Sequence, residues 1–376
     1  MNTKHPFNLK QLLALGSVVL LSPALRLFPA GVAAEAGRAV WLSPAAALPI
    51  LLAYAFFLCR FMGHRREGEG LAELSLRCLG ATAGRAFLAL LAAWLLLYAG
   101  FVLRAGADRF VTIIYPFARP AFFVLTTGLI SLIAALGSPR TAVRAAKLVA
   151  PLVYGVLLVI LLFSLFSVYA ANLLPVTVYD AVPVLRGSRA AVDIVATVLF
   201  SLCFLSGMTP KEERPFRRLS GWLLAMAALL TAISLAVVGN FGAALTDRLS
   251  RPFFMLVRNL VFFGSVERVE ALVVTFWIFP DFLLVALLLF SAQRCLRLAL
   301  GGRAPEYRGE RPLDLRGGRW VIPLCGAAAI LLGLLLAPTP AGLERWSEEL
   351  VPLMNQTAAF VPLPLVYAVG KIKKRL

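Results

Sequence analysis

Histidine and paired cysteine are scarce in this sequence. It holds two histidines, His5 and His64, and none of its five cysteines belongs to a C-x-x-C pair. Because these side chains supply most zinc sites and disulfide frameworks, the sequence predicts neither. It also lacks a phosphate-binding glycine loop and a recognisable nucleophile–base pair, so we predict no cofactor, no metal and no enzyme activity.

Charge is scarce as well. Only 15% of the 376 residues are charged and 60% are hydrophobic, with a mean hydropathy of +0.86. A soluble chain does not repeat apolar runs of about twenty residues, so the composition predicts an all-α polytopic membrane protein. The short alternating segments of a β-barrel are absent. The net charge of +18 is carried between the apolar runs, which fits membrane topology and anionic headgroups better than nucleic acid.

The apolar runs predict about ten transmembrane helices in one permease-like membrane domain over residues 1–376. They lie at roughly 11–33, 41–62, 84–103, 121–137, 148–171, 191–208, 220–240, 270–293, 320–337 and 347–369. The stretch 251–264 is too short to span and predicts an interfacial or re-entrant helix. The Arg-, Gly- and Pro-rich stretch 294–319 predicts an irregular loop. Two repeats are expected, over about 11–171 and about 191–369.

The distribution of lysine predicts the orientation. If the N-terminus is cytoplasmic, all seven lysines fall on the cytoplasmic side, and an even number of spans places the C-terminus there too. The N-terminus also resembles a secretory signal peptide, with Lys4 and Lys10 before an apolar core and Ala33-Ala34-Glu35-Ala36 after it. A proline-rich gap separates that core from the cleavage-like residues, so we predict that the first span is retained.

The first span contains prolines at membrane depth. Proline cannot donate the helical hydrogen bond, and bare lipid cannot satisfy the freed carbonyl, so Ser22-Pro23 predicts a break that lines a cavity. A Pro-kinked helix end is the alternative. In a two-repeat arrangement the sixth span is the counterpart of the first, and its Phe200-Ser201-Leu202-Cys203 stretch offers small and hydroxyl side chains to a ligand. Close helix packing is the alternative there.

Asp281 is the most conspicuous charge at membrane depth. It lies 11 residues past Glu270 and 13 before Arg294, close to the bilayer centre, where an ionised carboxylate is costly unless it is paired or faces a cavity. It is expected either to meet a cation, amine or proton, or to be a buried carboxyl that is neutral or paired with an arginine such as Arg26. Arg26 itself either binds a carboxylate or snorkels to the surface. Tyr98 either faces the cavity or packs in the core.

Four short motifs occur in a fixed order along the predicted spans. They are the Pro29 turn before Ala36-Gly37-Arg38-Ala39-Val40-Trp41; Asn172-Leu173-Leu174-Pro175-Val176; Val182-Pro183-Val184-Leu185-Arg186-Gly187; and Pro252-Phe253-Phe254 with Arg268-Val269-Glu270-Ala271. With these motifs the chain resembles, over nearly its whole length, the B-subunit family of bacterial spore germinant receptors in the amino acid–polyamine–organocation transporter superfamily. It departs from that family at Arg38, where an acid is usual, and at Leu21-Ser22-Pro23-Ala24, where glycine is common.

The resemblance implies a LeuT-like five-plus-five inverted repeat with broken first and sixth helices. It also implies a membrane subunit that binds a small germinant, often an amino acid, with A-type and C-type partner subunits in the spore inner membrane. The alternative is a stand-alone secondary transporter of amino acids or amines. The candidate ligand-binding residues are Leu21, Ser22, Pro23, Ala24, Tyr98, Phe200, Ser201, Cys203 and Asp281.

Overall fold

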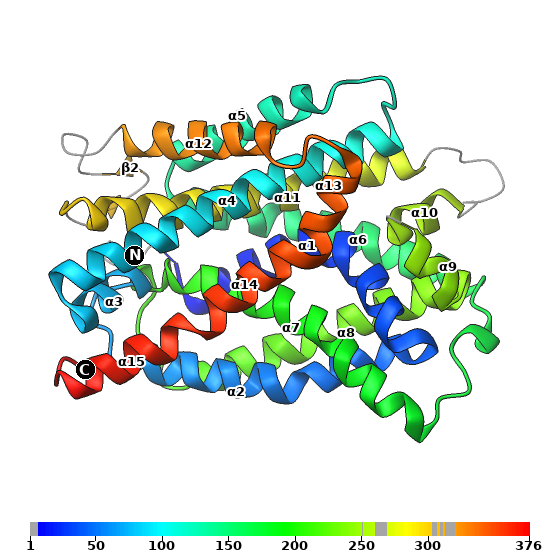
Figure 1. The fold of residues 1–376 in the computed structure, drawn as a ribbon, viewed down its shortest axis with the longest axis horizontal. Coiled ribbons are helices and arrows are strands. Elements are labelled where there is room, and N and C mark those ends of the chain that lie inside the picture. Colours follow the sequence, from blue (N-terminus) through cyan, green and yellow to red (C-terminus); the bar gives the residue numbers. More distant parts are fainter. Residues whose placement is uncertain (1–6, 250, 260–268, 303–306, 309–310, 313–319) are drawn as a thin grey trace.

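The fold is a bundle of long helices lying roughly side by side, with both marked termini at one end (Figure 1). The computed structural model describes residues 7–249, 251–259, 269–302, 307–308, 311–312 and 320–376. Its α-helices are α1 Leu9–Ala36, α2 Ser43–Gly63, α3 Leu71–Leu79, α4 Ala81–Ile113, α5 Pro120–Leu136, α6 Pro139–Leu165, α7 Ala181–Cys203, α8 Pro215–Phe241, α9 Ala243–Arg248, α10 Pro252–Asn259, α11 Val269–Ala299, α12 Val321–Leu335, α13 Pro340–Arg345, α14 Val351–Phe360 and α15 Pro362–Ile372.

Short elements connect these helices. Four 3-10 turns, η1 Gly37–Leu42, η2 Ala170–Asn172, η3 Val178–Asp180 and η4 Ser206–Met208, precede a π-helical turn, η5 Trp346–Leu350. Two short strands, β1 Tyr307–Arg308 and β2 Arg311–Pro312, pair antiparallel.

The long helices pack in two groups. One consists of α4, α5, α11 and α12, and the other of α1, α2, α7 and α8. Contacts also join α1 to α7, α2 to α8, α4 to α11 and α5 to α12. Each of these pairs joins a helix of the first half of the chain to its counterpart in the second half, as the predicted five-plus-five arrangement requires. Helix α6 packs on α1, α8 and α11, and α14 packs on α7.

Local sequence signals set the helix starts. Helix α1 begins with a capping box, in which the Asn8 side chain accepts from the Gln11 backbone N–H at 3.0 Å and the Gln11 side chain accepts from the Asn8 backbone N–H at 3.1 Å. Helix α6 begins with Ser138, whose hydroxyl accepts from the Thr141 backbone N–H, and has Pro139 at its first position. These caps satisfy donors that lie at the bundle ends.

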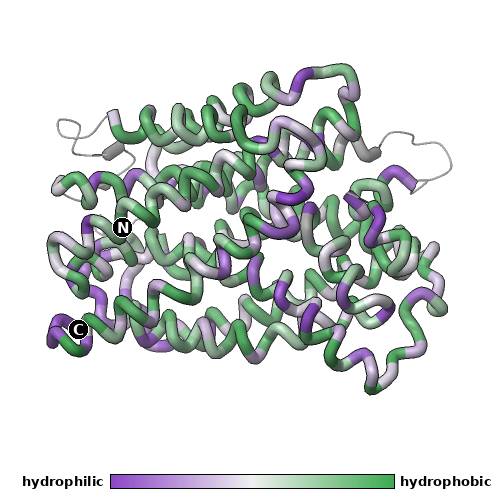
Figure 2. The backbone as a smooth tube through the Cα atoms, viewed as in Figure 1, coloured by the Kyte–Doolittle hydropathy of each residue, from purple (hydrophilic) through white to green (hydrophobic). Residues whose placement is uncertain are grey.

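The helices have the length and composition of an integral membrane protein. Within the described residues, seven helical segments are long and apolar enough to cross a bilayer, and α5 and α12 are shorter apolar helices. Figure 2 shows hydrophobic residues along the helices and most hydrophilic stretches toward the two ends of the bundle. Each of the ten predicted spans coincides with helical structure, although the number of membrane crossings stays a prediction.

The predicted break in the first span is wrong. Helix α1 is continuous from Leu9 to Ala36, with Pro23 and Pro29 inside it. Most of its middle is buried, and Leu21, Ala24 and Phe28 have no exposed surface. Contacts with neighbouring helices, among them α6, α7, α8 and α11, therefore keep it helical although each proline removes one backbone hydrogen bond.

The sixth span also differs from its prediction. Helix α7 is continuous, begins at Ala181 and ends at Cys203, so Phe200 to Cys203 form its last turn and are not mid-span. Helix α11 extends to Ala299, which corrects the loop predicted to begin at Arg294. The predicted helix at 251–264 is present as α10, and its residues 260–264 lie outside the described residues, as do Lys4 and Arg268.

Candidate functional site

A cavity of about 670 Å³ lies in the half of the bundle away from both termini. Its walls come from the second half of α1, the end of α4, the first half of α7, and the α13–α14 segment, with Asp247 and Arg251 at one side. Figure 1 shows α9, α10 and α13 at this end of the molecule. The central contact between α1 and α7 therefore borders the cavity.

Arg26 is the cationic residue that α1 contributes to the cavity wall. Its guanidinium carbon lies 4.8 Å from the centroid of the Phe101 ring on α4, a cation–π geometry. Its Nε and Nη2 atoms are buried and have no hydrogen-bond partner. The guanidinium is thus held against an aromatic face while its donors stay available.

Asp193 is the anionic residue that α7 contributes to the same wall. The residue is 3% exposed, and its Oδ1 atom is buried without a hydrogen-bond partner. No ion pair joins it to Arg26. The two central helices therefore each bring to the cavity wall a charged side chain with a polar atom that has no hydrogen-bond partner.

An aromatic group lies next to these charges. The Trp94 ring stacks on Tyr98 at 6.2 Å and meets Phe200 edge-on at 5.5 Å between ring centroids. The Trp94 indole N–H donates to Asn355 Oδ1 on α14 at 3.2 Å. Tyr98 lies within interaction range of Arg26, Asp193 and Asn355. This group joins α4, α7 and α14 beside the cavity.

Two acidic residues near the cavity, Asp108 and Asp281, are paired with arginines. Asp108, which lines it, accepts from Arg251 and lies 3.7 Å from Arg104. Behind the wall, Arg109 on α4 forms an ion pair with Asp281 on α11, and both side chains are 5% exposed. Helix packing is close there, because a Cβ atom at Gly106 would lie 3.1 Å from Asp281 Oδ2.

The predicted site residues are only partly brought together. Leu21, Ser22, Pro23 and Ala24 are buried within continuous α1, where the Leu21 carbonyl accepts from the Trp277 indole at 3.4 Å. Residues Tyr98 and Phe200 meet through Trp94, next to the cavity. Their role in binding stays a prediction.

The remaining predicted residues lie away from the cavity wall. Ser201 donates to the Thr197 carbonyl at 2.9 Å, and Cys203 is half-buried at the end of α7. Asp281 is not among the residues that line the cavity. It pairs with Arg109, whereas the sequence analysis had named Arg26 as an example of a partner. The alternative of a buried, paired carboxyl is thus the arrangement that the structure contains.

Asp193 and Asn355 were missed by sequence reasoning. Asp193 is a carboxylate within the apolar sixth span, so the cost that singled out Asp281 applied to it as well. It was passed over because it lies near the predicted start of that span, whereas α7 in fact begins ten residues earlier, at Ala181. Asn355 carries no comparable signal, since a single amide in an apolar helix is common.

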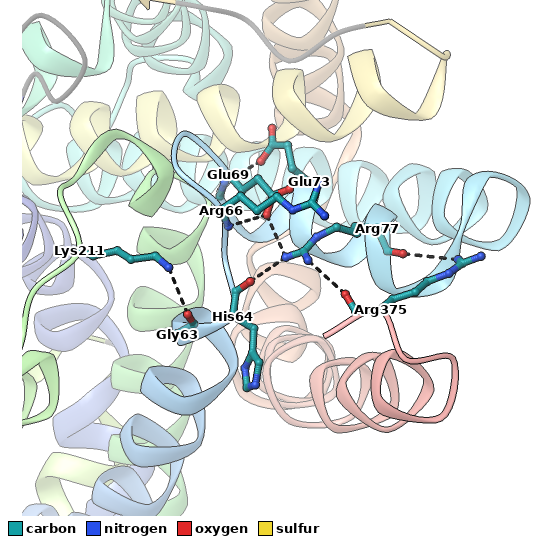
Figure 3. A network of polar contacts seen from close by, with 9 residues as sticks. Gly63, His64, Arg66, Glu69, Glu73, Arg77, Lys211 and Arg375 are labelled. Carbon is teal, nitrogen blue, oxygen red and sulfur yellow. Dashed lines mark hydrogen bonds and ion pairs between the residues drawn. The ribbon is translucent and has the colours of Figure 1, made fainter.

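The end of the bundle near the termini is closed by a polar network (Figure 3). Arg77 on α3 donates to the His64 carbonyl at 2.7 Å, to Glu69 at 3.0 Å and to the Arg375 carbonyl at 3.1 Å. Glu73 accepts from Arg294 Nε at 2.5 Å. These bonds connect α3 to the α2–α3 loop, α11 and the C-terminus.

The α2–α3 loop also packs closely on the end of α7. A Cβ atom at Gly70 would lie 2.5 Å from the Phe204 carbonyl oxygen, so only glycine fits. Arg65 donates to the carbonyls of Ser206, Thr209 and Pro210. Burial lowers the pKa of the Arg65 guanidinium from its ordinary value.

Comparisons with known proteins agree with this architecture. A family model described as "Spore germination protein" matches residues 7–303. A solved structure of a Na+-coupled sialic acid symporter, described as a substrate-bound outward-open state, superimposes with a TM-score of 0.64 and 14% sequence identity, covering 96% of this chain and 78% of that chain. At that identity the likeness shows the fold alone. No curated protein matches the sequence.

Proposed function

The chain belongs to the spore germination protein family, and from that premise we propose that it is the membrane subunit of a spore germinant receptor. It would bind a small germinant, an amino acid, in the cavity between α1 and α7 and so help to trigger germination. The observation that carries this proposal is the cavity of about 670 Å³, which is lined by Arg26 and Asp193 within a transporter fold. Cavities of this size hold small ligands.

The arrangement of the bundle supports a receptor that reads the outside of the inner membrane. With both termini in the cytoplasm, the cavity would lie toward the opposite side, from which a germinant arrives. The polar network around Arg77 would then close the cytoplasmic end. A-type and C-type subunits are the proposed partners, and the A-type subunit would carry the signal onward.

Ligand binding is tested on the purified full chain in lipid nanodiscs. We expect at least one of the twenty common amino acids to raise its melting temperature in a concentration-dependent way, because a ligand that binds only the folded state stabilises it. A chain that none of the twenty stabilises would contradict the proposal. The receptor role is tested by deleting the gene and measuring germination of the spores with the same amino acid.

Stand-alone transport of amino acids or amines is the second candidate, since the same fold can serve a transporter or a receptor subunit. It is distinguished by measuring uptake of the stabilising amino acid into proteoliposomes that contain this chain alone. Substrate accumulation without partner subunits, with normal germination in the deletion strain, would favour the transporter over the receptor subunit.

A further inference from the structure

Two charged residues of the cavity wall, Arg26 and Asp193, differ from Asp108 and Asp281 nearby. Asp108 is held by Arg251, and Asp281 is held by Arg109. Among the described residues, Arg26 has no acidic partner, and Asp193 has no basic one, although both lie within predicted spans. The amide of Asn355 is the neighbour of the Asp193 carboxylate, and it leaves Oδ1 without a hydrogen bond and adds no counter-charge. An ionised group in that environment is costly unless a partner neutralises it. One bound ligand could supply the missing counter-charge to both side chains.

We propose that Arg26 and Asp193 form a two-point site for a zwitterion, in which Arg26 binds a carboxylate and Asp193 binds an ammonium group. This inference rests on the proposed function and assigns the residues that recognise the ligand. The guanidinium of Arg26 has two free donors, Nε and Nη2, on adjacent atoms, which is the geometry that grips a carboxylate. Asp193 offers the free acceptor Oδ1 to an ammonium.

The surroundings favour a dipolar ligand over a net anion or cation. Arg26 and Asp193 lie on different central helices, and both line the cavity of about 670 Å³, which has room for a small molecule that contacts the two charges. Arg26 is additionally fixed by the Phe101 ring, and Asp193 is fixed by its burial in α7. A ligand with one charge would leave the other side chain uncompensated, whereas a zwitterion neutralises both.

The ligand's own charges provide the first half of the test. The probes are the amino acid that stabilises the wild type most, its carboxamide, which keeps only the ammonium, and its deaminated carboxylic acid, which keeps only the carboxylate. We expect each truncated probe to bind the wild type at least about tenfold more weakly, as loss of one charge-assisted hydrogen bond predicts.

The side chains provide the second half. Arg26→Gln should bind the amino acid and its amide with similar affinity, and Asp193→Asn should bind the amino acid and the deaminated acid with similar affinity. Arg26→Lys, which keeps the charge but not the paired donors, should bind with intermediate affinity. Arg38→Gln and Glu213→Gln remove charges from exposed positions outside the cavity and serve as matched controls.

The outcomes separate the two claims. If the wild type binds an amino acid and both variants bind it within about threefold of the wild type, the two-point site is wrong and the receptor proposal stands. The same conclusion follows if each variant loses affinity equally for all three probes, because that pattern indicates general damage to the cavity. If no amino acid binds the wild type, the proposed function fails and the two-point site fails with it.

Discussion

The charged pair Arg109–Asp281 and the charged residues Arg26 and Asp193 occupy neighbouring parts of the same bundle but are arranged differently. Arg109 and Asp281 join α4 to α11, are almost fully buried and bind each other. Arg26 and Asp193 lie on α1 and α7, line the cavity and leave buried polar atoms unpartnered. Membrane depth alone therefore does not mark a binding residue. The distinguishing feature is whether a charge at that depth already has its partner.

The largest effect is expected when the paired charge is removed. Asp281→Asn leaves the Arg109 guanidinium buried without its counter-charge, which should cost about 3–5 kcal/mol of stability. We expect much less membrane-inserted protein and a lower melting temperature for whatever is recovered. This expectation reverses the one based on Asp281 as a ligand residue, for which insertion would be normal and only the response would be lost.

A second substitution sharpens this result. Adding Arg109→Gln to Asp281→Asn removes the orphaned cation, so the double variant should recover part of the lost stability. Quantitative immunoblots of the membrane fraction, with melting curves of purified protein, measure both steps. Normal insertion of Asp281→Asn with loss of ligand response would instead assign Asp281 to the ligand.

The fold class could be predicted from the sequence, whereas the contacts between distant helices could not. Ten apolar runs and four motifs were enough for the fold class, because hydrophobicity over about twenty residues is a local property. The continuity of α1 was missed because Pro23 is a local helix breaker, and only contacts with surrounding helices keep the chain helical there. The partner of Asp281 could not be named, because Arg109 lies 172 residues away.

The candidate site was harder to predict than the fold. Tyr98 and Phe200 were predicted as ligand-binding residues, and that role stays a prediction; the structure shows that both contact Trp94. The cavity itself depends on how α1, α7 and α14 are placed, which no local pattern reports. The same placement leaves Asp193 Oδ1 without a hydrogen-bond partner, which the sequence alone does not indicate.

A smaller effect is expected at the closed end of the bundle. Glu73 accepts hydrogen bonds from the Gly70 backbone N–H at 2.8 Å and from Arg294 at 2.5 Å, and its side chain is 14% exposed. Glu73→Gln keeps the shape but removes the charge, so we expect a loss of about 1.5–3 kcal/mol, less than at Asp281. Melting curves compare the two variants directly. Equal losses of stability in Glu73→Gln and Asp281→Asn would show that the extent of burial does not determine how much each ion pair contributes.

Removing an unpartnered charge should have a still smaller effect of opposite sign. Arg26→Gln eliminates a cation that has no counter-charge in the ligand-free chain, so the melting temperature without ligand should stay unchanged or rise by the equivalent of up to about 1 kcal/mol. Asp193→Asn should behave in the same way. A clear drop in either variant would indicate a structural partner for that side chain and would end the contrast with Asp281.

The smallest effect is expected at an exposed pair near the mouth of the cavity. Arg345 and Glu349 lie one helical turn apart at 3.3 Å, but their side chains are 73% and 67% exposed. Water screens such a pair and each side chain loses rotamer freedom to form it, so it contributes between 0 and about 0.5 kcal/mol. Glu349→Gln should therefore melt within experimental error of the wild type at low salt and show no salt dependence of its own. A loss of stability comparable to that of Glu73→Gln would contradict the solvent-screened state of this pair. Repeating the melting curves with and without the partner subunits would show whether a subunit contact buries it.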